Sequence, residues 1–214
     1  SMYNNKNGNQ GAIALANALS VNCTLTTLYM NYNNIGNQCA IALAAALITN
    51  KSLTWLYMQD NNIGNQGAIA LAEALKTNKS IEVLNIRFNN IDAQGTEALA
   101  DALRVNQTLT KLSMGGNKFG NQGAIALANA LSVNCALTTL YVDGNSIGDE
   151  GAQALVNAVK DNYTLTTLNV YVNKFSVELQ EQLDTLMTDY EQSRKWNMKV
   201  EFLLRIGYKS PNSP

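Results

Sequence analysis

The chain has 214 residues, 46% of them hydrophobic, and a net charge of -1. Its lysines and arginines form no cluster beside an aromatic run, so the electrostatic signature of a nucleic-acid binder or an anionic-membrane binder is missing. The longest apolar stretch, Cys39 to Ile48, is about half of the roughly 20 residues that a membrane span needs, so we expect no membrane insertion.

An internal repeat governs the organisation of the chain. The segment NQGAIALANALSVNC, from Asn9 to Cys23, recurs unchanged from Asn121 to Cys135. Three further versions lie between these copies, and each follows the last by 28 residues. A fixed period of roughly 20 to 50 residues is typical of a solenoid, so we predict one continuous array of stacked units.

Each unit opens with a block that predicts a short strand. In residues 53–80 the spacing is L-x-x-L-x-L-x-x-N-x-I, and Leu56 alternates with Met58 as expected for a strand with one buried face. The asparagine of this block stands where the chain leaves the strand, and its amide can satisfy a donor and an acceptor of neighbouring backbone. We therefore predict an asparagine ladder, formed by Asn33, Asn61, Asn89, Asn117, Asn145 and Asn173.

The second half of each unit predicts a helix. From Asn65 to Thr77 the apolar residues follow helical spacing, with alanines beside the leucine stripe that let neighbouring helices pack closely. Another asparagine follows the helix at Asn22, Asn50, Asn78, Asn106 and Asn162, where it also forms Asn-x-Ser/Thr glycosylation motifs. Left-handed asparagines commonly end helices, so we expect that conformation and a structural role for this column.

Together these blocks resemble the ribonuclease-inhibitor-like subfamily of leucine-rich repeats. The resemblance rests on the strand block and on the helix block G-A-x-A-L-A-x-A-L, both with a 28-residue period, and covers about Gly8 to Phe175. It implies an α/β fold: a right-handed β-α horseshoe with a parallel concave sheet, convex helices and about six 28-residue repeats.

The pattern changes after Phe175, so we predict two regions, a leucine-rich repeat array over residues 1–175 and a C-terminal helical cap and tail over residues 176–214. A capping helix is expected from Val177 to Lys195. Its apolar surface is expected to come from Val177, Leu183 and Met187, followed by an amphipathic segment with Trp196, Val200, Leu203 and Leu204. The first residues fall inside a repeat, which favours a segment of a longer array or a bare first unit.

Candidate binding residues lie in the strand columns that point away from the core, because these columns vary while the framework columns hardly do. In a horseshoe they line the concave surface, and strands about 4.8 Å apart would bring Tyr29, Trp55, Tyr57 and Arg87 into one patch. Tryptophan, tyrosine and arginine are enriched in binding hot spots. The alternative is that solvent positions drift freely and aromatic residues merely pair across strands. The predicted contact residues are Tyr29, Tyr32, Trp55, Tyr57, Asp60, Arg87, Phe88, Lys111, Tyr141, Asp143 and Tyr171.

The convex side offers a second candidate surface. Ile13, Ile41, Ile69 and Ile125 lie opposite the leucine stripe of their helices and are expected to be exposed. The first three belong to consecutive units, so we hypothesise an apolar ridge through which the chain could self-associate.

The absence of histidine excludes histidine-activated nucleophiles and the commonest metal ligand, so we expect a protein that is not an enzyme and has no cofactor or metal. We predict a protein–protein interaction module whose partner is neither nucleic acid nor membrane. The resemblance leaves two alternatives open: a GTPase-activating or other regulator, and a segment of a larger receptor or secreted pathogen effector. Three cysteines cannot all pair, which favours the cytoplasm, or the host cytoplasm for an effector.

Overall fold

The computed structural model describes residues 8–188, which form alternating helices and strands. The helices are α1 (Gly8–Val21), α2 (Asn37–Thr49), α3 (Asn65–Thr77), α4 (Ala93–Val105), α5 (Gly120–Leu131) and α6 (Asp149–Asp161). The strands are β1 (Thr27–Tyr29), β2 (Trp55–Tyr57), β3 (Val83–Asn85), β4 (Lys111–Ser113), β5 (Thr139–Tyr141) and β6 (Thr167–Asn169). A further helix covers residues 177–188. Within residues 8–188, no helix is long and apolar enough to cross a membrane.

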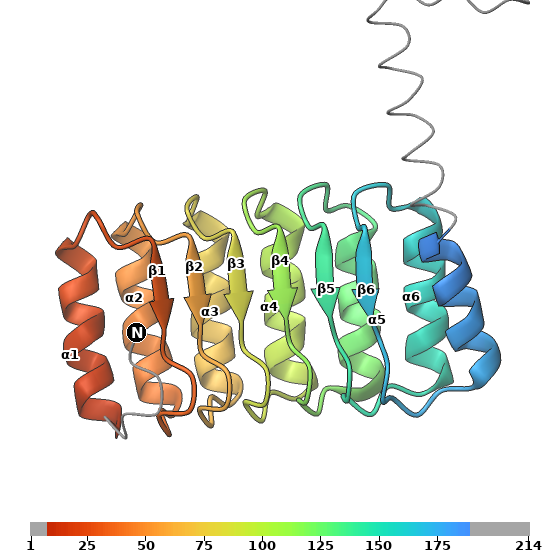
Figure 1. Cartoon of the computed structure of the whole chain (residues 1–214), viewed down its shortest axis with the longest axis horizontal. Coiled ribbons are helices and arrows are strands. Elements are labelled where there is room, and N and C mark those ends of the chain that lie inside the picture. The colour runs from red at the N-terminus through yellow and green to blue at the C-terminus, as the bar shows by residue number, and fades with distance from the viewer. Residues whose placement is uncertain (1–7, 189–214) are drawn as a thin grey trace, which may run out of the picture.

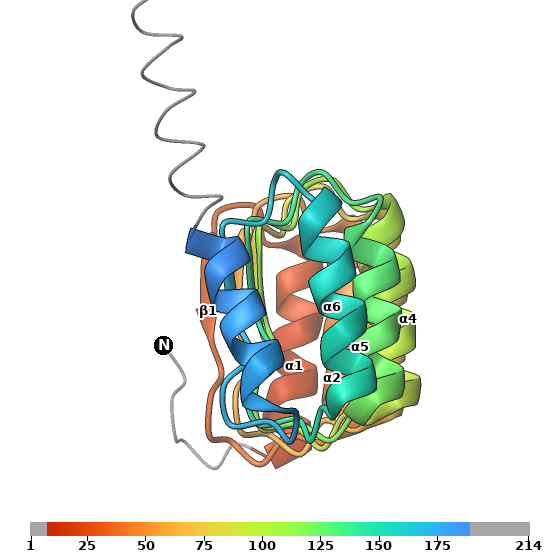
Figure 2. The same ribbon diagram turned by 90° about the vertical axis from the view of Figure 1, so that its right-hand side faces the viewer.

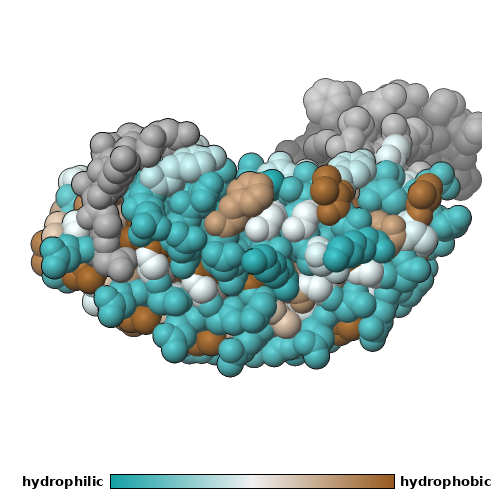
Figure 3. All heavy atoms as spheres, turned by 90° about the horizontal axis from the view of Figure 1, so that it is seen from below, coloured by the Kyte–Doolittle hydropathy of each residue, from teal (hydrophilic) through white to brown (hydrophobic). Residues whose placement is uncertain are grey.

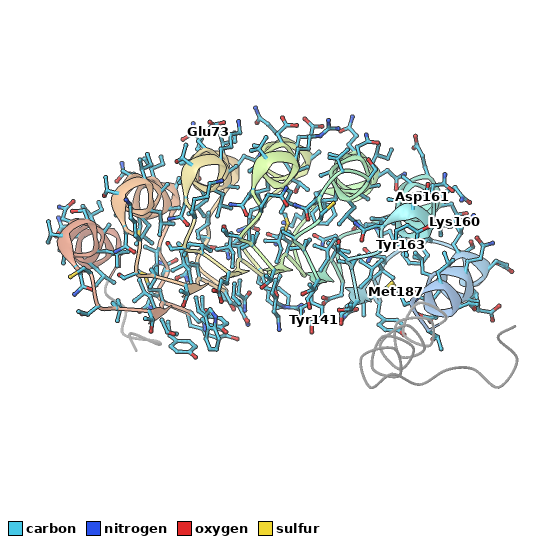
Figure 4. All side chains as sticks on the ribbon, turned by 90° about the horizontal axis from the view of Figure 1, so that it is seen from above. Glu73, Tyr141, Lys160, Asp161, Tyr163 and Met187 are labelled. Carbon is cyan, nitrogen blue, oxygen red and sulfur yellow. The ribbon has the colours of Figure 1, made fainter. Side chains whose placement is uncertain are left out.

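The six strands form one parallel sheet in sequence order. Each strand pairs with the next so that equivalent residues of neighbouring units lie opposite each other, as Leu28 lies opposite Leu56. Figure 1 shows the strands side by side in front of the helices. Seen from above, the helices occupy the outer arc and the strands the inner one (Figure 4). The predicted solenoid of β-α units, with a parallel sheet on the inner side and about six repeats, is therefore confirmed.

The core is a thin layer between the sheet and the helices. Strands β1 to β5 bury their central leucines, whereas Leu168 of β6 is half-buried. Leu56 of β2 and the nearby Met58 are completely enclosed. From the helix side, Leu71 and Ala72 of α3 fill the same layer. Small side chains on neighbouring helices allow close parallel packing, as the alanine columns predicted.

The strand-end asparagines form the predicted ladder. Asn61 Nδ2 donates to the carbonyl oxygens of Met30 (2.8 Å) and Met58 (3.0 Å). Its Oδ1 accepts hydrogen bonds from the backbone N–H groups of Asn33 (2.9 Å) and Ile35 (3.3 Å). Because the contacts join one unit to the next, the side chain replaces hydrogen bonds that the turning backbone cannot make for itself.

The ladder is interrupted where the turn after β4 differs from the others. After β1, β2, β3 and β5 the residue that follows the strand-end asparagine is left-handed, as is Asn62 (φ 58°), whereas after β4 the left-handed residue is Gly120 (φ 56°), which follows Phe119. Among the described residues, Asn145 Oδ1 is a buried side-chain oxygen that accepts no hydrogen bond. The changed turn explains this, because it no longer presents its backbone N–H groups to that oxygen.

The helix-end asparagines form a second ladder, and the expected left-handed conformation is wrong. Asn50 is extended (φ -71°, ψ 129°). Its Nδ2 donates to the carbonyl oxygens of Leu19 (2.9 Å) and Asn22 (2.8 Å) in the previous unit. Its Oδ1 accepts from the backbone N–H of Leu53 (2.8 Å), which begins the approach to the next strand. The equivalent buried residues are Asn78, Asn106, Asn134 and Asn162.

The convex isoleucines are less exposed than the sequence predicted. Ile41 is 43% exposed, whereas Ile13, Ile69 and Ile125 are half-buried. The expectation of four exposed side chains is therefore wrong for three of them, because closely packed neighbouring helices cover part of each side chain.

The helix over residues 177–188 lies at the end of the array, beyond α6 and β6 (Figures 1 and 2). Leu179 and Leu183 are buried, and Met187 packs against the core. Val177 is 69% exposed, so its predicted place in the apolar surface is wrong: it stands in the first turn and faces away from the core. The remainder of the expected capping helix, up to Lys195, and the amphipathic segment that follows it lie outside the described residues.

The three cysteines differ in accessibility, which gives a direct test of the fold. Cys39 is buried, and burial raises the pKa of its thiol to about 12, whereas Cys23 and Cys135 are exposed. Because the thiolate is the reactive form, we expect two of these thiols to react quickly with a disulfide reagent in the folded protein and the third only after denaturation. The variant Cys39→Gly, which restores the residue of the equivalent Gly67, should remove only the slow reaction. Rapid reaction of all three would contradict the packing of α2.

Candidate functional site

An aromatic patch occupies the strand face of the first two units and consists of Tyr29, Trp55 and Tyr57. The rings of Tyr29 and Tyr57 are stacked, with centroids 4.7 Å apart and planes 10° apart, because parallel register places them opposite each other. Trp55, at the start of β2, is 42% exposed. Burial, and then the neighbouring Tyr29, raises the pKa of Tyr57. The stack therefore holds two rings in place beside an accessible indole.

A second set of residues follows the strands, one in each unit, and each of them has a left-handed backbone conformation. We call it the left-handed column, and its members are Tyr32 (φ 59°), Asp60 (φ 58°), Phe88 (φ 53°), Gly116 (φ 67°), Gly144 (φ 65°) and Val172 (φ 59°). Adjacent units are joined by equivalent hydrogen bonds, such as Tyr32 N–H to the Gln59 carbonyl (3.0 Å). The Gln59 amide also donates to the Tyr32 hydroxyl (2.7 Å), a contact that the sequence did not predict.

Figure 3 looks along the strands onto the edge of the solenoid at which they end, over the whole length of the array. The surface there is mostly hydrophilic, with separate hydrophobic side chains among polar ones rather than one continuous apolar area. Tyr32, Phe88 and Val172 of the left-handed column are among the large exposed hydrophobic residues. This composition suits recognition that combines ring contacts with polar contacts.

Arg87 and Asp143 were predicted as separate contact residues, but the structure makes them partners. Two hydrogen bonds, both 2.6 Å, join the guanidinium to the carboxylate. They cross Gly115, where a Cβ would lie only 2.5 Å from Arg87 Nη1 and 2.6 Å from Asp143 Oδ1. The Arg87 guanidinium also lies 5.4 Å from the Phe88 ring centroid. Arg87 is therefore held toward β5 and does not join the aromatic patch.

Toward the C-terminal end, the predicted contact residues Lys111, Tyr141 and Tyr171 each have a partner within the chain. Lys111 Nζ lies 4.9 Å from the centroid of the Tyr141 ring, and Figure 4 shows Tyr141 on the strand side, opposite the side that bears Glu73. The Tyr171 hydroxyl donates to Asp184 Oδ1 (3.2 Å) of the helix over 177–188. The nearby negative charge of Asp184, that hydrogen bond and slight burial raise the pKa of Tyr171.

The structure divides the eleven predicted contact residues by position. Toward the C-terminal end, hydrogen bonds and ring contacts engage Arg87, Lys111, Tyr141, Asp143 and Tyr171. Near the N-terminal end the side chains are at least partly exposed and also make ring and hydrogen-bond contacts with one another or with their neighbours; they are Tyr29, Tyr32, Trp55, Tyr57, Asp60 and Phe88. Gly115, which separates the two charges, and Asp184 were not predicted.

A family model described as "Leucine Rich repeat" matches residues 21–44, 49–72, 77–100, 105–128 and 133–156, which together make up more than half of the chain. A search of curated proteins found no match.

Two solved structures have a similar fold. The structure entitled "Leiomodin-1 Actin-Binding Site 2 (ABS2)" has a TM-score of 0.65 and 19% sequence identity, with 78% of this chain and 96% of that chain covered. The tropomodulin C-terminal domain from Caenorhabditis elegans has a TM-score of 0.52 and 18% identity, with 88% and 98% covered. At these identities the likeness shows the fold alone.

Proposed function

Because the chain belongs to the leucine-rich repeat family, we propose that it is a non-enzymatic interaction module that binds a protein partner on its concave strand face. The similar leiomodin-1 structure is named as an actin-binding site, which supports a protein as the kind of partner. The complete helix in every 28-residue unit supports the ribonuclease-inhibitor-like subtype within the family.

The observation that carries this proposal is the aromatic patch. Tyr29 and Tyr57 fix each other by stacking, so little side-chain freedom remains to be lost when a partner binds. Trp55 presents its indole beside them. Aromatic side chains that are accessible and already ordered are the residues that most often dominate binding energy.

A GTPase-activating role has less support from the site. One common way to stabilise the charge on a transferred phosphoryl group is an arginine that can reach it. Arg87, the arginine of the strand face within the described residues, is held by two hydrogen bonds to Asp143 and would first have to leave that partner.

Self-association through Ile13, Ile41 and Ile69 also has less support than concave-face binding. Only Ile41 of the three is exposed, and the other two offer part of a side chain each. We therefore place the main contact on the strand face.

Replacement of Trp55 by alanine tests the proposed contact. We expect Trp55→Ala and Tyr57→Ala each to weaken binding by about 2 kcal/mol, or roughly 30-fold, because each removes a large side chain from the patch. The partner is first captured with the native chain and then titrated by calorimetry, and the melting temperature is recorded for every variant.

The matched control is Tyr163→Ala, which removes an exposed tyrosine outside the strand columns. It should leave affinity unchanged. If Trp55→Ala also leaves affinity unchanged, the patch is not the binding surface. The same holds if the variant loses affinity only because it is unfolded at the temperature of the titration, as its melting temperature would show.

A further inference from the structure

Four residues of the left-handed column carry side chains, although the backbone conformation there could be supplied by glycine. Gly116 and Gly144 occupy the column in two units, so a residue without a side chain is sufficient for the turn. Phe88 and Val172 adopt the same positive φ, which costs free energy for a bulky or β-branched residue. Val172 is 86% exposed, so burial does not offset that cost at its position. The Phe88 ring lies over Gly116, yet Phe88 remains 47% exposed. Exposed side chains on a strained backbone point to a use outside folding.

Charge distinguishes one segment of this column, Tyr32–Asp60–Phe88, which spans three consecutive units. Each member is one strand spacing, about 4.8 Å, from the next. Asp60 is exposed, and none of the ion pairs among the described residues includes it. Its carboxylate is therefore a negative charge without an ion-pair partner among residues 8–188, in the unit between those of Tyr32 and Phe88, and the Phe88 ring leans away from it over Gly116.

On the same face, an arginine side chain of this chain already contacts both a carboxylate and an aromatic ring. In the next unit, the Arg87 guanidinium bonds through both of its terminal nitrogens to Asp143, which lies two units beyond it, and is 5.4 Å from the centroid of the Phe88 ring. A planar guanidinium suits both contacts, since it can bond to a carboxylate in a fork while its face lies against a ring. The segment around Asp60 has the ring and the carboxylate but lacks the arginine.

We propose that the Tyr32–Asp60–Phe88 segment binds an arginine side chain of the protein partner, with the guanidinium on the Asp60 carboxylate and against the flanking rings. The inference rests on the proposed concave-face function and adds the chemistry of the partner to it. The aromatic patch lies on the adjoining strands, so one partner surface reaches both: an apolar contact on Trp55 and an arginine on Asp60.

The first test uses two short peptides, acetyl-Ala-Ser-Arg-Ser-Ala-amide and the same peptide with citrulline, the neutral isostere of arginine. Binding to the full chain is followed by the chemical shifts of the backbone amides. We expect the arginine peptide alone to move the amides of Tyr32, Asp60 and Phe88. Equal shifts with citrulline, or no shifts with arginine, would overturn the proposal.

The second test uses substitutions. Asp60→Asn should weaken the arginine peptide about tenfold, as expected for loss of a charge-assisted contact, whereas Glu82→Gln, which removes the same charge from an exposed position outside the column, should not. Tyr32→Gly and Phe88→Gly should also weaken the peptide while the melting temperature changes little, because glycine suits the left-handed backbone.

The captured partner separates this inference from the proposed function. If Trp55→Ala weakens the partner and Asp60→Asn does not, concave-face binding stands and the arginine site is wrong. If Asp60→Asn weakens the arginine peptide and the partner whereas Trp55→Ala has no effect, the arginine site stands and the aromatic patch is wrong. Loss of both effects rejects both.

Discussion

Asn89→Ala is expected to lower the free energy of unfolding by roughly 3 to 5 kcal/mol. Asn89 Oδ1 accepts hydrogen bonds from the backbone N–H groups of Asn61 (3.1 Å) and Ile63 (3.0 Å). Its Nδ2 donates to the carbonyl oxygens of Met58 and Arg87, both at 2.9 Å. Alanine leaves the two backbone N–H groups without partners, at about 1 to 3 kcal/mol for each, whereas the carbonyls of Met58 and Arg87 keep hydrogen bonds from Asn61 Nδ2 and the Asp60 N–H. Equilibrium unfolding in urea measures the change.

The control for this substitution is Asn129→Ala, which removes an exposed asparagine side chain from α5. It should be neutral or slightly stabilising, because alanine is the better helix former. If Asn89→Ala costs no more than this control, the ladder does not stabilise the array.

A chain that ends at Lys174 is expected to lose about 3 to 6 kcal/mol of stability and to fray at its last units. The deletion removes Leu179 and Leu183, which are buried against the core, and full burial of such a side chain contributes about 1.5 to 3 kcal/mol. The loss is comparable to the whole stability of a marginal domain. Amide hydrogen exchange should show reduced protection in β6 and α6 first, because each unit is stabilised mainly by its neighbours.

Two point variants separate capping from a general effect of shortening the chain. Leu183→Asp should reproduce much of the loss, since it places a charge at a site that is 1% exposed, whereas Val177→Asp should not. A chain ending at Lys174 that melts at the temperature of the full chain would show that residues beyond it are not a cap.

The repeat made the framework predictable. The strand block, the helix block and the asparagine at the strand end each recur at one phase, and the place of that asparagine at the end of a strand indicates that it bonds to the backbone of neighbouring turns. The helix-end ladder could not be predicted in the same way. Asn50 donates to the Leu19 carbonyl, 31 residues earlier, and that oxygen comes within reach only after two helices have stacked, so the common left-handed helix ending was the better local expectation.

The candidate site was predictable only as a set of columns. The sequence indicates that Arg87, Gly115 and Asp143 share a column in successive units, but treating the column as independent contact positions hid the ion pair across the glycine. Opposite charges on either side of a glycine were the available signal. The left-handed conformation of Phe88 depends on the turn that follows each strand, and a side chain there would not be expected from local preferences.

The Arg87–Asp143 pair limits where the array can gain units. Both ladders connect a unit only to its neighbour, so duplicating a whole 28-residue segment reproduces every ladder contact, and the identical segments at Asn9 and Asn121 are what such copying leaves behind. The ion pair is different because it spans three units. A unit inserted between β3 and β5 would move the two charges a further 4.8 Å or so apart and leave both without their partner. We therefore expect an inserted 28-residue unit to destabilise the array more between Arg87 and Asp143 than on either side of this ion pair.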